Sequence, residues 1–175
     1  QRTIAKSIEI LGIGLHKGVP VKMRLEPLDS DMGIVFYRSD AGVTIPLKRE
    51  NVVDTKMATV IGKDGVVIST IEHLLSAVYA YGIDNLRVVI DNDEVPVLDG
   101  SSAGYCMLIE EARIKELDKS KKAIKIKKQV EITTPEGKRV TLKPSNRIVY
   151  DFEITFAHPA IGKQNFHFDY SIAEY

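Results

Sequence analysis

The sequence has 175 residues, of which 44% are hydrophobic and 27% charged, and its 24 basic and 24 acidic side chains give a formal net charge of +0. This length can bury a substantial core as one large domain or two small ones, and the balanced charge indicates no nucleic-acid partner. No run approaches the ~18 apolar residues of a membrane span, and the single cysteine, Cys106, excludes an internal disulfide and suits a reducing compartment.

The first part of the chain is predicted to be rich in strands. Residues 3–11 have the composition of a strand, and residues 12–18 follow as a glycine-rich turn that contains His16. Its three glycines allow the backbone to approach another segment closely, and the absence of a following helix excludes the dinucleotide-binding form of this motif. Further strands are predicted at 21–26, 34–37 and 43–47, and a hairpin at 60–68 that turns at 62–65.

A helix is predicted from Ser69 to Gly82. Ser69 and Glu72 have the spacing of a capping box, and Gly82 can adopt the left-handed conformation that ends a helix. Glu72 and His73 then fall in the first turn, where unpaired amides and the helix dipole suit a carboxylate and a neutral imidazole beside a metal or an oxyanion. From spacing alone, the simpler interpretation is that Glu72 completes the cap and His73 is a half-buried histidine. The predicted buried stripe comprises Leu74, Leu75, Val78 and Tyr81.

Two later polar segments have simple structural interpretations. After a strand at 86–90, residues 91–96 contain three carboxylates and an asparagine, but not in the spacing of a calcium loop, so a solvated turn is predicted. Residues 99–102 are predicted to open a second helix with N-cap serines, since the elbow motif of a nucleophilic serine is missing. The expected buried face of this helix comprises Tyr105, Leu108, Ile109 and Ala112.

The chain is predicted to divide into a first domain at 1–120 and a second unit at 121–175. Residues 113–128 carry eight basic and two acidic side chains and are interpreted as a linker leading into a strand at 124–132 with a cationic solvent face. A turn at 135–138 and alternating strands follow, without a helix. The predicted fold class is therefore α+β, with a two-layer sheet/helix sandwich followed by the strands of a second, incomplete domain of the same kind.

The strands of the second unit carry aromatic residues that need a covering layer. Either the first domain or a partner provides this layer, or the chain stops early, and we favour an early stop. We then expect a partly open apolar face that promotes self-association or recruits a partner. The residues concerned are Phe152, Phe156, Phe166 and Phe168.

Six short segments along the chain match a known family in the same order. They are Gly12–His16, Asp54–Thr55, Ser69–His73, Gly82–Asn85, Glu94–Ser101 and His158–Ile161. Together they resemble the zinc-dependent UDP-3-O-acyl-N-acetylglucosamine deacetylase family of lipid A (lipopolysaccharide) biosynthesis in Gram-negative bacteria. The resemblance covers about residues 1–175 and implies two α+β domains with the active site between them. It also implies a cytoplasmic, monomeric hydrolase, a zinc cofactor and a UDP-linked acylated N-acetylglucosamine substrate.

The resemblance assigns roles by position. It makes His73 a zinc ligand and Glu72 the general base that takes a proton from the zinc-bound water during hydrolysis of the acetamide. The substrate-binding matches are His16 lining the site, Met57 near the acyl passage, and Lys138 and Phe156 at the uridine diphosphate. For Phe156, core packing is the alternative interpretation.

One departure from the family pattern affects activity. The family's other two zinc ligands and its second catalytic histidine are absent from these 175 residues, whereas a catalytic zinc needs three protein ligands. We therefore expect the N-terminal portion of a deacetylase, inactive alone. The alternative is a complete, non-catalytic module that binds a nucleotide sugar or an acyl chain. A downstream, in-frame H-K-x-x-D motif favours the first hypothesis, and a stop codon the second.

Overall fold

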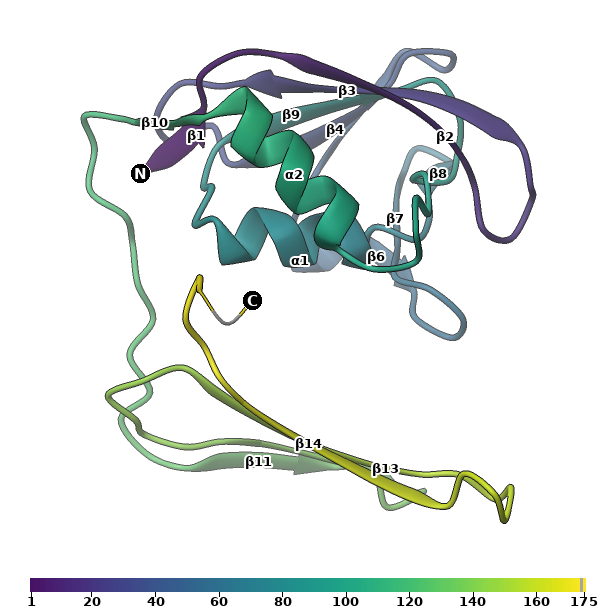
Figure 1. Ribbon diagram of the computed structural model, residues 1–175, viewed down its shortest axis with the longest axis vertical. Coiled ribbons are helices and arrows are strands. Elements are labelled where there is room, and N and C mark those ends of the chain that lie inside the picture. Colours follow the sequence, from purple (N-terminus) through teal and green to yellow (C-terminus); the bar gives the residue numbers. More distant parts are fainter. Residues whose placement is uncertain (174) are drawn as a thin grey trace. The chain divides into compact units, whose positions relative to one another are not determined.

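The computed structural model describes residues 1–173 and 175 and divides into two compact units, Gln1–Lys121 and Lys122–Tyr175 (Figure 1). The first unit contains both helices and most of the strands, whereas the second contains strands alone. Neither helix of the described chain has the length and apolarity needed to cross a bilayer.

A five-stranded sheet and two helices form the body of the first unit. The strand order is β2 (Ile8–Ile13), β3 (Pro20–Pro27), β9 (Leu86–Ile90), β4 (Ile34–Arg38) and β5 (Val43–Pro46). All neighbours are antiparallel except β4 and β9. Helices α1 (Glu72–Ala80) and α2 (Ala103–Ala112) cover one face of this sheet (Figure 1). The predicted α+β sandwich is thereby confirmed.

The core lies between this sheet and the helices. Strand β3 alternates buried and more exposed positions, as its apolar–polar pattern predicts, because successive side chains point to opposite faces. Each large apolar side chain buried in this way contributes about 1.5–3 kcal/mol. The predicted helix stripe is confirmed at Leu74 and Val78, with Leu75 and Tyr81 partly buried at its edge, and α2 buries Tyr105, Ile109 and Ala112.

Smaller sheets complete the first unit. The strand predicted at 3–11 is two strands, because the chain leaves the direction of β1 (Arg2–Ile4) after Ile4, where the Ala5 N–H donates to the Arg113 carbonyl at 2.8 Å. Strand β1 pairs with β10 (Ile114–Glu116) instead of the main sheet.

A three-stranded sheet contains the predicted hairpin at 60–68. Strands β7 (Val60–Lys63) and β8 (Val66–Ile68) pair through a turn in which Asp64 and Gly65 have φ of 54° and 78°, as a type I′ turn requires. A short 3₁₀ helix (Arg49–Asn51) leads into the third strand, β6 (Val52–Asp54), which the sequence analysis missed.

The start of α1 differs from its prediction. The helix begins at Glu72 with Ile71 as its N-cap, and no side chain caps it, so the predicted capping box is wrong. Ser69 is unavailable because its N–H and hydroxyl both donate to the Asp93 carbonyl, at 2.8 and 3.1 Å. The predicted end is confirmed: Gly82 has φ 63°, and its N–H and that of the next residue donate back into the last turn.

The serines before α2 also act differently from the prediction. Ser102 is the N-cap residue but makes no side-chain cap bond. The Ser101 hydroxyl instead accepts a hydrogen bond from the Ala103 N–H at 3.0 Å, and it lies 3.0 Å from each oxygen of the Asp99 carboxylate. The serines therefore have a structural role at the start of α2, as predicted, but the hydroxyl that accepts the backbone hydrogen bond belongs to Ser101 and not to the N-cap residue Ser102.

The second unit consists of two antiparallel pairs. Strand β11 (Val130–Thr133) pairs with β12 (Arg139–Leu142), and β13 (Val149–Thr155) pairs with β14 (Lys163–Asp169). The strand predicted at 124–132 therefore begins only at Val130. No residue in the described part of this unit is fully buried, and Phe152 and Phe166 are 53% and 63% exposed.

Candidate functional site

The first turn of α1 carries Glu72 and His73, both half-buried. The Glu72 carboxylate accepts a hydrogen bond at its Oε2 from the Thr59 N–H, at 3.1 Å. Thr59 follows an exposed loop in which Met57 is 84% exposed. The structure therefore holds the Glu72 carboxylate against the base of the loop that carries Met57, another predicted site residue.

The segment that enters α1 is held by hydrogen bonds from another part of the chain. Besides the contacts between Ser69 and Asp93, the Val95 N–H donates to the Ser69 carbonyl at 3.0 Å. Thr70 has φ 58°, a left-handed conformation that strains a β-branched residue, and it is only 2% exposed. Its hydroxyl donates to Oε1 of Glu94 at 3.1 Å. The backbone two residues before Glu72 is thus fixed by its partners.

The carboxylate of Glu94 is buried, with 2% exposure, so the prediction of a solvated turn is wrong at this residue. Its Oε1 accepts a hydrogen bond from the His16 N–H at 2.9 Å, and its Oε2 accepts one from the Lys17 N–H at 3.2 Å. Three donors therefore replace water around one carboxylate. Neighbouring Asp93 binds the Lys17 ammonium and is partly buried.

The glycine-rich turn makes this contact possible. A Cβ at Gly14 would lie 2.5 Å from Oε2 of Glu94, and one at Gly12 would lie 2.7 Å from Cβ of Pro96. The expected close approach of the backbone to another segment is therefore confirmed, and its partner is the strand-like segment at 94–96. The His16 side chain is exposed, and its backbone N–H donates to Oε1 of Glu94, the oxygen that also accepts from the Thr70 hydroxyl.

Asp99, in the segment that leads into α2, is a further acid that the sequence analysis did not single out. The backbone N–H and hydroxyl of Ser101 hold the pKa of Asp99 below its usual value, and the imidazole of His73 makes a smaller contribution. The burial of Glu94 has no local signal in the sequence, because its contacts join segments distant in sequence, whereas the contacts of Asp99 with Ser101 are local.

The other two predicted site residues belong to the second unit. Lys138 lies exposed in the turn before β12, where its carbonyl accepts a hydrogen bond from the Thr134 N–H at 2.8 Å. Phe156 follows β13 and is 45% exposed, so core packing does not describe it within this unit. Both side chains are accessible in the described part of the unit.

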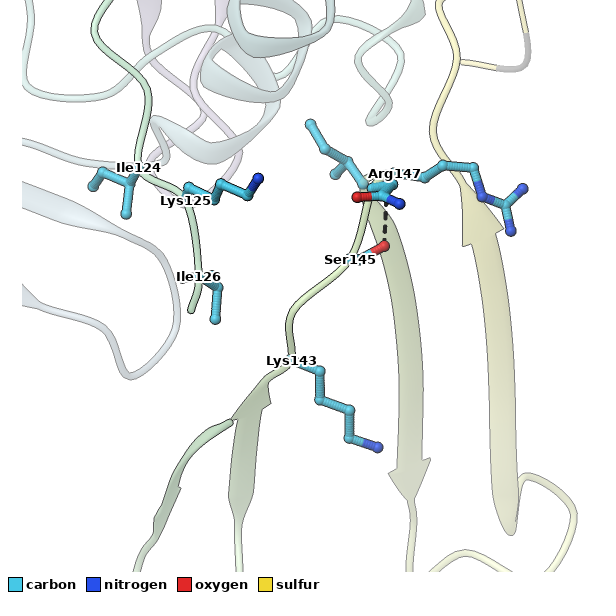
Figure 2. Close-up of a pocket in the computed structure, with 8 residues that line it drawn as sticks. Ile124, Lys125, Ile126, Lys143, Ser145 and Arg147 are labelled. Atoms are coloured by element: carbon cyan, nitrogen blue, oxygen red, sulfur yellow. Dashed lines mark hydrogen bonds between the residues drawn. The ribbon is translucent and has the colours of Figure 1, made fainter. Parts of the chain in front are cut away.

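The second unit also contains a shallow pocket of about 370 Å³ (Figure 2). A hydrogen bond of 3.0 Å from the Arg147 N–H to the Ser145 hydroxyl braces its wall, and the Arg147 guanidinium pairs with Asp169. None of the predicted site residues lines it. The lining residues are Ile124, Lys125, Ile126, Lys143, Ser145, Asn146, Arg147 and Ile148.

The donor set for a metal is incomplete in the described residues. Across residues 1–173 and 175, no group of three or more His, Cys, Asp or Glu side chains is arranged to hold a metal ion. His73 provides one imidazole, which suits zinc, but a catalytic zinc site uses three protein ligands. The described residues therefore do not by themselves form a three-ligand site of this kind.

Comparison with known proteins identifies one family over the whole chain. The family model described as LpxC, UDP-3-O-acyl N-acetylglycosamine deacetylase, matches residues 1–175. The UDP-3-O-acyl-N-acetylglucosamine deacetylase of Aliarcobacter butzleri is 87% identical over 100% of this chain and 58% of its own length. Those of Nautilia profundicola and Helicobacter pylori are 62% and 59% identical, again over 100% of this chain, and the matches cover 60% and 59% of their lengths. The chain thus spans less than two thirds of each of these relatives.

Proposed function

The chain belongs to the UDP-3-O-acyl N-acetylglycosamine deacetylase family, and on that premise we propose that the protein containing it removes the N-acetyl group from a UDP-linked, acylated N-acetylglucosamine in lipid A biosynthesis. We place this reaction in the cytoplasm, in keeping with the resemblance. The observation that carries the proposal is that Glu72 and His73 are adjacent in the first turn of α1 and that the Thr59 N–H holds the Glu72 carboxylate.

Glu72 is the proposed general base. Its half-buried carboxylate has one oxygen fixed by a backbone donor, which limits rotation and directs the group. A carboxylate in this position can accept a proton from a water molecule attacking the acetamide carbonyl and deliver it to the leaving nitrogen.

His73 is the proposed zinc ligand of this chain, and further ligands are needed from outside the described residues. A zinc ion bound there would lower the pKa of its water toward ~7 and polarise the amide carbonyl. The half-buried imidazole is anchored by a helix whose following residues pack into the core, which gives it a defined position.

The remaining predicted residues are proposed to bind the substrate. The exposed thioether of Met57 suits contact with an acyl chain, and the exposed His16 is proposed to line the site. In the second unit, the Lys138 ammonium suits the diphosphate, and the exposed ring of Phe156 offers an apolar surface for the uridine.

The proposal is tested by Glu72→Ala in the full-length protein. General-base removal is expected to lower kcat by about 10²–10⁴-fold while the metal content stays unchanged. Glu111→Ala is the matched control, because Glu111 is an exposed glutamate whose contact with Lys6 is a 3.8 Å ion pair. If the Glu72→Ala variant keeps more than about a tenth of the kcat of the unmodified protein, Glu72 is not the general base and has only a structural role. Substrate binding without turnover by the unmodified protein would favour the alternative, a non-catalytic binding module.

A further inference from the structure

The burial of Glu94 is costly and calls for an explanation beyond folding. The hydrogen bonds to its carboxylate come from two backbone N–H groups and one hydroxyl, and the nearby Lys17 ammonium pairs with Asp93 instead. A buried carboxylate is tolerated when donors satisfy it, but an apolar side chain of similar size usually stabilises a core as well or better. The value of this carboxylate therefore lies in which segments it joins.

One of those segments is the His16 turn. The successive N–H groups of His16 and Lys17 each donate to a different oxygen of Glu94, an arrangement that fixes the orientation of the turn as well as its distance. Gly14 permits this contact, because any larger residue would meet the same carboxylate.

The other segment is the entrance to α1. The Thr70 hydroxyl donates to the oxygen that also accepts from His16, and Thr70 holds the left-handed conformation noted above. Such strain persists only where neighbouring contacts determine the backbone. Relaxation of Thr70 would rotate the chain directly before Glu72 and His73.

We propose that Glu94 is a positioning residue, which fixes the His16 turn and the Glu72–His73 turn relative to each other. The inference rests on the function proposed above. Because a displacement of about 1 Å in an active site can lower the rate ~10²-fold, loss of this anchor should reduce turnover without removing any group that touches the substrate.

The first test is Glu94→Gln in the full-length protein, with Glu26→Gln as the matched control. Glu26 is a partly buried glutamate of β3 that pairs with Arg24 and Arg87. The introduced amide can keep the contacts of Oε1 to His16 and Thr70, but its NH₂ group then opposes the Lys17 N–H. Hydrogen exchange at the Lys17 amide should accelerate at least about tenfold, with a smaller change at His16.

The same variant should lower kcat by roughly 10–10²-fold, with KM changed less than about threefold. The NMR signals of the Glu72 and His73 amides should also shift, and Glu26→Gln should alter none of these quantities. A Glu94→Gln protein with accelerated exchange at Lys17 but an unchanged kcat overturns the positioning role and leaves the proposed function intact.

A second pair of variants covers the case in which Glu94→Gln does not fold. Thr70→Ser keeps the hydroxyl and should retain kcat within about threefold, whereas Thr70→Val keeps the shape and should lose about tenfold. Equal kcat in the two variants contradicts the proposal. If the unmodified full-length protein does not deacetylate the substrate, the proposed function fails. The role of Glu94 is then tested by NMR alone. The amide signals of Glu72 and His73 should shift in Thr70→Val but not in Thr70→Ser, and equal signals in the two variants contradict the positioning role.

Discussion

Two glutamates of the first unit are held by backbone N–H groups, and they differ in exposure in the way that their proposed roles require. Glu72 accepts one such bond and stays half-buried, so its carboxylate can still meet a substrate. Glu94 accepts two such bonds and a third from the Thr70 hydroxyl, and it is only 2% exposed, so its carboxylate cannot contact a substrate. A proton-transfer group needs access, whereas an anchor needs saturation of its acceptors.

At the same scale, His73→Ala in the full-length protein should lower zinc content much more than stability. The imidazole is half-buried, and the core face of α1 is provided by Leu74, Ala77 and Val78, so its loss leaves the helix packing in place. Metal analysis and thermal denaturation measure the two effects. His167→Ala, which removes an exposed histidine paired with Asp151, is the matched control. Full zinc occupancy in His73→Ala would remove His73 from the ligand set.

Asp40 provides a pH-dependent prediction. The hydrogen bonds from Arg38, at 2.6 and 2.8 Å, are the main reason why the pKa of Asp40 lies below its usual value. A lowered pKa in the folded state contributes stability above the unfolded pKa of ~3.9, and this contribution disappears as the pH falls through the folded value. Because the side chain is 42% exposed, the contribution is at most about 0.5 kcal/mol.

Asp40→Asn should therefore lower the free energy of unfolding slightly at pH 7, and the difference from the unmodified protein should shrink as the pH falls toward ~3. Urea denaturation across this range measures it. Asp64→Asn, in the exposed turn of the β7–β8 hairpin, is the control. A difference between Asp40→Asn and the unmodified protein that grows toward acid would contradict the sign.

At the scale of elements, local patterns determined what could be predicted. The alternation of β3, the turn of the β7–β8 hairpin and the glycine that ends α1 all depend on neighbouring residues, and all were predictable. The start of α1 was not, since Ser69 is bonded to Asp93, 24 residues away. The same applies to the candidate site: the position of Glu72 and His73 in the first turn of a helix was predictable, but the burial of Glu94 depends on a turn 78 residues away.

Gly82→Ala tests the C-terminal end of α1. Gly82 has φ 63°, and a Cβ there would meet only Arg2 Nη1, at an ordinary contact distance of 3.7 Å. The cost is therefore conformational, about 1 kcal/mol of the free energy of unfolding in urea. Gly82→Asn should cost less, because asparagine tolerates the left-handed conformation. Equal stability of the alanine variant and the unmodified protein would show that the helix end relaxes freely.

At the scale of the whole molecule, the two units differ in how their apolar side chains are covered. The first unit contains every fully buried residue among those that the structure describes, and nearly all of the hydrophobic ones form a single core cluster. In the second unit, the paired strands β13 and β14 present an aromatic face formed by Tyr150, Phe152, Phe166 and Phe168. A two-stranded pair is marginal in water by itself, so we expect that further contacts stabilise these strands.

Residues 1–175 prepared alone should therefore self-associate and should not deacetylate the substrate with added zinc. Phe152 and Phe166 are cross-strand partners at the centre of the aromatic face, and an apolar surface of this kind favours contact with another copy. Turnover is not expected, because the described residues offer no group of three metal-binding side chains.

Light scattering over a range of concentrations should give a mass that rises with concentration. The double variant Phe152→Ser/Phe166→Ser should lower that mass, whereas Met107→Ser, on an exposed position of α2, should not. A strictly monomeric 1–175 with zinc-dependent turnover would contradict both expectations.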